Sequence, residues 1–360
     1  MRKALAGVLF VYFVVMSLYS IFRVKVLLVL GYTPTDLVIF NESLSTTIHG
    51  AGFFYNHIEG VSHFGVHNSP ILLLILPLYK VWPSADLLLV LQTLSVTLAA
   101  VPFFKLSKLI LKDENAAFAF TLLYLFSPFV LGVLRFDFHA VSLALPFIFL
   151  SLYYLEKGEY VKAFLVSLVV LLVREDAGLF PISVGLYLLA LNYKRNARWA
   201  FLFGAAGVFW IGLSVFVVIP HFSHFHFYNR YTGKVLWRFV VYLVSVSLLS
   251  TGFLPLFAGK RMVLLVLPFL ELALSNYWAM MAIGDHYQWL FGPLLLVVAL
   301  YGARRLSRRA FWGSVAVAGV FSLLFSPVFS PLFPHYLNAP YLLASRIDAT
   351  FKLARILLFR

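Results

Sequence analysis

The 360-residue chain is 62% hydrophobic and only 12% charged, with a formal net charge of +14. A soluble domain carries about 25% charged residues, so this composition excludes an ordinary soluble protein. The chain has no cysteine, which excludes disulfides, thiol catalysis and thiolate metal sites. Apolar runs of the about 20 residues needed to cross a bilayer recur along the sequence, so we expect an all-α, polytopic membrane protein.

The positive charge gathers in short segments between the apolar runs. Lys and Arg cluster, for example, at 105–112, 194–198 and 304–309. This is the positive-inside pattern of cytoplasmic loops, so the charge marks topology and we expect no nucleic-acid partner. Arg2 and Lys3 place the N-terminus in the cytoplasm of a cell-membrane protein. We interpret the apolar run that follows as an uncleaved signal-anchor.

The first span is expected from about residue 4 to residue 22, or as far as Leu30. A long outer loop, 31–68, comes next. Within it, Thr35–His49 has apolar residues at helical spacing and a polar opposite face, which predicts an amphipathic helix on the membrane surface. Ser69–Val81 is too short to span, so we expect a half-helix at the outer edge.

The later apolar runs bring the expected total to about eleven spans, with a cytoplasmic N-terminus and an extracytoplasmic C-terminus. These spans run from a cap at Ser84 to Lys105, and over 115–134, 140–155, 161–173, 178–193, 199–219, 239–258, 262–281, 287–303 and 310–326. A second outer loop covers 220–238. We interpret 1–336 as a single membrane domain and 337–360 as an amphipathic tail on the outer face.

All ten histidines and nine of the fourteen acidic residues fall in segments expected on the outer face. These side chains carry out proton transfer and ligand binding, so the chemistry is predicted outside the cytosol. Asp36 and Glu42 lie on the expected surface helix, and His63 and His67 precede the half-helix. A partly desolvated carboxylate is a usable base, although simple capping by Asp36 explains its position equally well.

Arg174, Glu175 and Asp176 follow one another between two short apolar runs. Successive ionisable groups are costly in a membrane unless they face a cavity, so we expect this turn to face a polar chamber. The alternative is a connecting loop that contains a salt bridge. Asp137 with His139 could join a metal site, but capping of the following helix by Asp137 is the simpler interpretation.

The remaining polar candidates lie later in the chain. Asp285 and His286 begin an expected span and are predicted to face the chamber. His221, His224 and His226 alternate with aromatic residues, at a spacing that matches no standard zinc motif. Arg230 and Lys234 follow them, and arginine suits phosphate through paired hydrogen bonds. Glu271 is expected to pair with a neighbouring helix near mid-membrane.

Four stretches resemble a family of predicted archaeal and bacterial membrane proteins of unknown function. They are Thr35–Glu42, Ser62–Pro70, Phe136–Ala140 and Arg174–Gly178, and with the helices between them they cover roughly the first 200 residues. That family in turn resembles the GT-C superfamily of integral-membrane glycosyltransferases. The likeness is architectural: an opening span, a large outer loop with an early Asp, surface helices and then a bundle.

The GT-C resemblance implies transfer of a sugar from a polyprenyl- or dolichyl-phosphate carrier to a glycan, lipid or protein acceptor. Asp36 matches the position of the base. The candidates for catalysis or for positioning of substrate are Asp36, Glu42, His63, His67, Glu175 and Asp176, and those for the donor phosphate are Arg174, Arg230 and Lys234.

The usual paired-acid motif is not intact, because Leu37 and Val38 follow Asp36. We therefore expect no cofactor and leave a divalent ion at Asp36 open. Two other functions remain: a transporter or flippase of a lipid-linked or polar solute, and a non-catalytic GT-C-like assembly partner. The lack of an internal repeat counts against the transporter, whereas the broken acid pair favours the assembly partner.

Overall fold

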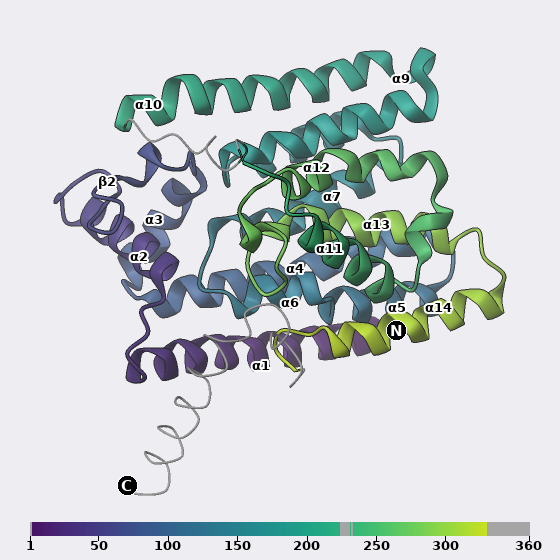
Figure 1. Ribbon diagram of the computed structural model, residues 1–360, viewed down its shortest axis with the longest axis horizontal. Coiled ribbons are helices and arrows are strands. Elements are labelled where there is room, and N and C mark those ends of the chain that lie inside the picture. Colours follow the sequence, from purple (N-terminus) through teal and green to yellow (C-terminus); the bar gives the residue numbers. More distant parts are fainter. Residues whose placement is uncertain (1, 224–230, 232, 330–360) are drawn as a thin grey trace, which may run out of the picture.

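The computed structural model describes residues 2–223, 231 and 233–329, and it is an all-α structure. Most of its long helices run side by side along the horizontal direction of Figure 1. They are α1 (Arg2–Val29), α2 (Thr35–Ile48), α3 (Ile71–Val81), α4 (Ala85–Leu111), α5 (Glu114–Leu125), α6 (Pro128–Arg135), α7 (Leu145–Glu156), α8 (Tyr160–Leu171), α9 (Leu179–Leu213), α10 (Ile219–Phe222), α11 (Trp237–Ser250), α12 (Val266–Ala273), α13 (Phe291–Ala303) and α14 (Arg308–Leu324). A short antiparallel hairpin pairs β1 (Tyr55–Asn56) with β2 (Val61–Ser62).

Four helical stretches among the described residues are long and apolar enough to cross a membrane. They are Lys3–Val29, Ala85–Leu111, Glu114–Arg135 and Glu175–Phe222. Large apolar side chains cover their outer surfaces, as at Phe10 and Phe216, which are 69% and 79% exposed. Such surfaces suit hydrocarbon rather than water. The chain is therefore a helical membrane protein, as its composition predicts.

Helix α4 lies at the centre and packs against α1, α5 and α7. It begins where the sequence predicts, because the Ser84 hydroxyl accepts the backbone N–H of Asp86 at 3.1 Å. Its buried Thr93 and Thr97 hydroxyls donate to backbone carbonyls one turn earlier, at 2.9 and 2.7 Å. These polar groups are thereby satisfied within the apolar interior.

Helix α9 is two antiparallel halves joined at Asn192, whose backbone is extended (φ −162°, ψ 98°) (Figure 1, top). The halves approach through glycine. A Cβ placed on Gly207 would lie 2.3 Å from the Gly178 carbonyl oxygen, and one on Gly185 would lie 2.7 Å from that of Ala200. Small residues let membrane helices pack backbone to backbone. The break at Asn192 falls at the end of the first of the two segments, 178–193 and 199–219, that the sequence predicts.

Two predicted helices, 239–258 and 262–281, are wrong as continuous elements. α11 ends at Ser250 because Gly252 adopts φ +59° against α14, where a Cβ would lie 2.0 Å from the Ser314 carbonyl oxygen. α12 stops at Ala273, and residues 274–290 form turns and short 3₁₀ segments. This irregular segment carries Asp285 and His286.

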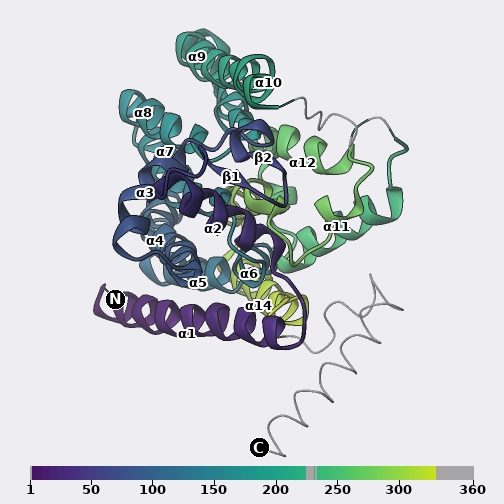
Figure 2. The ribbon, with the colours of Figure 1, turned by 90° about the vertical axis from the view of Figure 1, so that its left-hand side faces the viewer.

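Helices α2 and α3 and the β1–β2 hairpin gather at one end of the helices, here called the α2 end (Figure 1, left; Figure 2, front). Both helices match their predicted bounds within two residues. The apolar face of α2 is buried through Leu37, Phe40 and Leu44. The Tyr79 hydroxyl of α3 donates to the Asn41 side-chain oxygen of α2 at 2.8 Å, which joins the two helices.

The glycine contact within α9 gives a test of the fold. Gly207→Ala is expected to destabilise the protein by about 1–3 kcal/mol, because the added methyl group overlaps the Gly178 backbone. Gly204→Ala is the matched control, since nothing lies within 4 Å of its Cβ and alanine favours a helix. Thermal unfolding in detergent micelles compares them. Equal midpoints for the two variants would show that the contact does not hold the hairpin.

Candidate functional site

A polar cavity of about 180 Å³ lies at the α2 end. α2, the loop before α3 and three later turns supply its walls, so residues far apart in sequence meet there. Its polar lining residues are Asp36, Glu59, His63, His67, His139, Arg174, His286 and Tyr287. Six of these are among the candidates predicted from the sequence; Glu59 and Tyr287 are additional.

Asp36 lies in the first turn of α2, and its side chain retains 27% exposure. Burial raises the pKa of this carboxyl to about 7; the nearby Asp137, Glu59 and Asp285 carboxylates raise it further, and His67 opposes them. His286 Nδ1 lies 3.9 Å from the carboxylate. A carboxyl that titrates near neutral pH is suited to accept and release a proton.

A distant carboxylate lies near the start of α2. Pro34 precedes the helix and gives it no side-chain cap, and the Asp137 carboxylate lies near the backbone of Asp36. Asp137 also pairs with Arg23 of α1 at 3.7 Å. Burial raises the pKa of Asp137, and Arg23 opposes this shift. The helical segment after Asp137 is capped by His139, whose ring accepts the backbone N–H of Val141 at 3.4 Å, and not by Asp137, which corrects the sequence interpretation.

Arg23, which pairs with Asp137, is not among the residues predicted from the sequence. Its position could have revealed it, because a cation within an apolar helix needs a partner inside the protein.

Gln92 of α4 fixes the turn that carries His139. Its amide nitrogen donates to the carbonyls of Val133 and Asp137 at 3.1 and 3.0 Å, and its oxygen accepts the His139 N–H at 3.0 Å. Burial, with His286 and Arg174 nearby, holds the pKa of His139 well below its usual value, so the ring is neutral at pH 7. It stacks on the His286 ring, with centroids 3.8 Å apart.

His63 and His67 are each oriented by a carboxylate. His63 Nδ1 donates to Glu59 at 3.1 Å and His67 Nδ1 to Glu175 at 2.8 Å. Although burial alone would raise the pKa of Glu59, hydrogen bonds from His63 and Asn56 hold it below the usual value. Among the described residues, the buried Nε2 of His63 has no hydrogen-bond partner. A ligand or water on this side of the cavity would remove that cost.

Glu175 ties the first loop to the α9 hairpin. Its second oxygen accepts the backbone N–H of Asn68 at 3.1 Å. The Asn68 amide donates to the Ser214 hydroxyl at 2.8 Å, which in turn donates to the Trp210 carbonyl at 2.7 Å. Trp210 closes the chain of hydrogen bonds by donating its indole N–H to the Arg174 carbonyl at 3.0 Å. Such a network rigidifies the groups that it joins.

Arg174 is buried, and its guanidinium binds Asp176 through two N–H groups, one of them at 2.7 Å. Arginine has five N–H donors, so donors remain for an anion in the cavity. Arg174 and Glu175 thus lie at a polar chamber, as the sequence predicts for this turn.

Other predicted site residues do not line the cavity. Glu42 lies on another face of α2 and pairs with His57, whose side chain is 67% exposed. Lys234 is exposed and contributes nothing to the cavity wall. Asp285 lies just behind the wall, where burial raises its pKa to about 6 and Arg135 opposes the shift. Arg230, His224 and His226 are outside the described residues.

Asp36, His139 and His286 bring carboxylate and imidazole donor atoms within 4.8 Å of one another. A divalent ion binds imidazole nitrogens in the ring plane at about 2.0–2.1 Å. The two rings are stacked, with only 18° between their planes, so their lone pairs run parallel and do not converge on one point. This arrangement does not fit a single ion.

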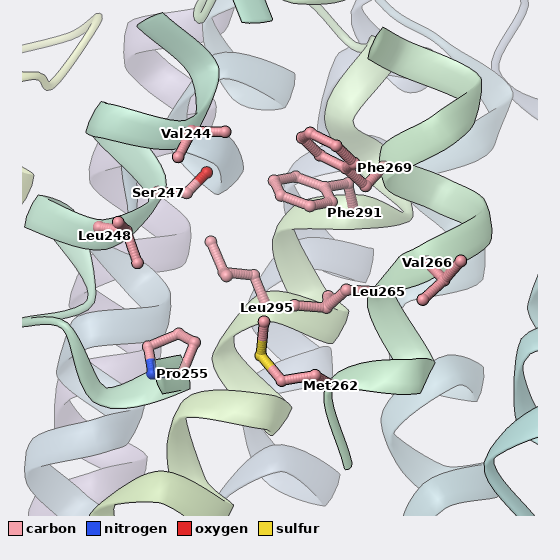
Figure 3. Close-up of a pocket in the computed structure, with 10 residues that line it drawn as sticks. All are labelled: Val244, Ser247, Leu248, Pro255, Met262, Leu265, Val266, Phe269, Phe291 and Leu295. Atoms are coloured by element: carbon pink, nitrogen blue, oxygen red, sulfur yellow. The ribbon is translucent and has the colours of Figure 1, made fainter. Parts of the chain in front are cut away.

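A separate cavity of about 270 Å³ lies between α11, α12 and α13 (Figure 3). Its walls are apolar apart from Ser247, whose hydroxyl donates to the Leu243 carbonyl at 2.6 Å. Because ligand sites use a few convergent polar groups to fix orientation, this cavity is not a candidate for the chemistry.

The fold and the buried polar cavity define a helical membrane protein that gathers titratable side chains at one end. The chain matches the family model described as "Predicted membrane protein (DUF2079)" over residues 26–349. The protein therefore belongs to this family of predicted membrane proteins, which confirms the first resemblance. No curated protein and no solved structure matches the chain.

The Glu175 tie can be tested directly. Glu175→Gln removes the charge and one of the two acceptor oxygens, and a hydrogen bond to a charged group contributes about 1.5–3 kcal/mol. We expect the backbone N–H of Asn68 to exchange with deuterium at least about tenfold faster than in the unmodified protein. Glu159→Gln, which alters an exposed carboxylate paired with Lys162, is the control. Unchanged exchange in both variants would rule out Glu175 as the tie.

Proposed function

We propose that this protein is a glycosyltransferase that moves a sugar from a polyprenyl-phosphate carrier to an acceptor on the extracytoplasmic face of the membrane. The observation that carries the proposal is that the Asp36 carboxyl and the Arg174 guanidinium line one cavity. Transfer from a lipid phosphate needs both a base for the acceptor and a fixed cation for the leaving phosphate.

The reaction is a single displacement. The acceptor hydroxyl gives its proton to the Asp36 carboxylate while its oxygen bonds to the anomeric carbon of the sugar. The bond from that carbon to the phosphate oxygen breaks, and its electron pair stays on the lipid phosphate beside Arg174. Attack from the face opposite the phosphate inverts the configuration. The permanent charge of Arg174 makes it suitable for the leaving group.

The histidines position the reacting groups. His63 Nε2 faces no protein partner among the described residues, so it is available to a sugar hydroxyl. Glu175 holds the His67 ring on the cavity wall. At about 180 Å³ the cavity is smaller than the about 300–1,000 Å³ of drug-sized sites, which favours one sugar ring with its phosphate. The carrier chain then lies outside the cavity, among the membrane helices.

Asp36→Asn is expected to lower transfer by about 10²–10⁴-fold, the usual contribution of a general base. Asp86→Asn is the matched control, because Asp86 pairs with Lys25 outside the cavity. Proteoliposomes are incubated with radiolabelled polyprenyl-phosphate hexoses, and label is followed from carrier to product. A chelator is expected to leave the rate unchanged.

Two outcomes of this assay contradict the proposal. Movement of intact donor across the bilayer, without transfer, would favour the flippase. Equal rates for Asp36→Asn and the unmodified protein would remove Asp36 from catalysis.

The raised pKa of Asp36 determines how the rate of sugar transfer should depend on pH. The carboxylate is the active form, and its pKa is about 7, so kcat/KM should rise through pH 7 and be about tenfold below its plateau at pH 6. Asp285→Asn removes one carboxylate that raises the Asp36 pKa, so the rising limb should move to lower pH. A limb near pH 4 in the unmodified protein would contradict the assignment.

A further inference from the structure

A third pocket, of about 320 Å³, lies between α12 and the paired ends of the α9 hairpin; we call it the α9–α12 groove. Leu270 and Leu274 form its α12 side and are 39% and 49% exposed. Ile211 and Val215 face them from the hairpin. In a membrane protein, an apolar opening of this kind faces hydrocarbon chains.

The inner end of the groove is acidic. Glu175, Asp176 and Glu271 line it, and none of its described lining residues is basic. The Asp176 and Glu271 carboxyl groups interact with each other in this part of the groove. Glu271 therefore has a neighbouring partner, as its sequence position predicts. The groove thus presents hydrogen-bond acceptors where a lipid head group would lie.

The groove and the polar cavity share a wall. Glu175 lines the groove, and the same carboxylate accepts the Nδ1–H of His67, which lines the cavity. Arg174 lines the cavity, and its guanidinium binds Asp176, which lines the groove. The turn 174–176 therefore separates an apolar compartment open to lipid from the compartment that contains Asp36.

The other face of α12 provides an internal comparison. Val266 and Phe269 line the apolar cavity of Figure 3, whose walls carry no ionisable side chain. Two largely apolar pockets thus flank α12. Of these two, only the α9–α12 groove is also lined by carboxyl groups. Ionisable groups in such a position are costly, and they distinguish the groove from the cavity on the other face of α12.

We infer that the α9–α12 groove binds a membrane lipid whose head group donates hydrogen bonds and bears no net negative charge, and that this lipid is the acceptor. Its chains contact Leu267, Leu270 and Leu274, and its head group meets Glu175 and Glu271. The three carboxyl groups disfavour an anionic head group, so the donor phosphate binds on the cavity side, at Arg174. The acceptor role rests on the proposed function, whereas the binding does not.

The test uses the full chain in phosphatidylcholine nanodiscs with a diacylglycerol that carries a photoreactive diazirine in one acyl chain. No sugar donor is present. We expect cross-links on α12 and on residues 211–215, displaced by unlabelled dioleoylglycerol and poorly displaced by dioleoyl phosphatidic acid. Cross-links elsewhere, or equal displacement by the two lipids, would overturn the inference.

Substitutions in α12 sharpen the result. Leu270→Trp narrows the opening and should lower cross-linking about tenfold, the effect of about 1.4 kcal/mol. Phe269→Trp enlarges a side chain that lines the cavity of Figure 3 and not the groove, and it should leave cross-linking unchanged.

These measurements separate the two proposals. Because they follow binding alone, loss of groove binding with intact sugar transfer would overturn only the present inference. Groove binding without any sugar transfer would instead support the lipid site and contradict the proposed glycosyltransferase activity.

Discussion

The carboxylate of Glu175 is the interaction on which the site depends. One oxygen accepts from the His67 ring and the other from the Asn68 backbone, so the long first loop is fixed to the turn before α9. A buried charge lowers stability unless its hydrogen-bonding capacity is used, and here both oxygens are satisfied. The same tie places Asp36 and Arg174 around one volume, although 138 positions separate them in the sequence.

Burial shifts the pKa values of a carboxyl group and an imidazole of the cavity in opposite directions. It raises the pKa of Asp36 and lowers that of His139, because the charged form of each is the one that loses solvation. Both groups are therefore brought toward their neutral forms at physiological pH. Arg23 and Arg135 compensate for part of the negative charge, through Asp137 and Asp285.

Local patterns predicted much of the fold. The amphipathic face of α2, the short α3, the Ser84 cap and the break between the α9 segments all follow from spacing, length and capping chemistry. The breaks after α11 and α12 were missed. Gly252 interrupts the chain because of a close approach to α14, and a single sequence contains no signal of that contact.

The site was predicted in its residue types and only partly in its geometry. Glu42 was grouped with Asp36 because both are acidic and lie on one helix. Six residues turn an α-helix by about 240°, so the two point to different sides, whereas Ile39 and Phe40 share the cavity face of Asp36. Gln92 was missed because its role, satisfying the backbone of a distant turn, arises only from tertiary packing.

The glycine contacts of the α9 hairpin also hold its two halves together. Its halves touch through their backbones at Gly178 and Gly207, so the two helices cannot separate without losing that contact. α12 is only eight residues long and continues into the irregular segment 274–290. Displacement of α12 breaks fewer regular hydrogen bonds than separation of the hairpin. Among the described helices, a sideways path from the bilayer toward the buried polar groups therefore meets less resistance beside α12 than through the hairpin.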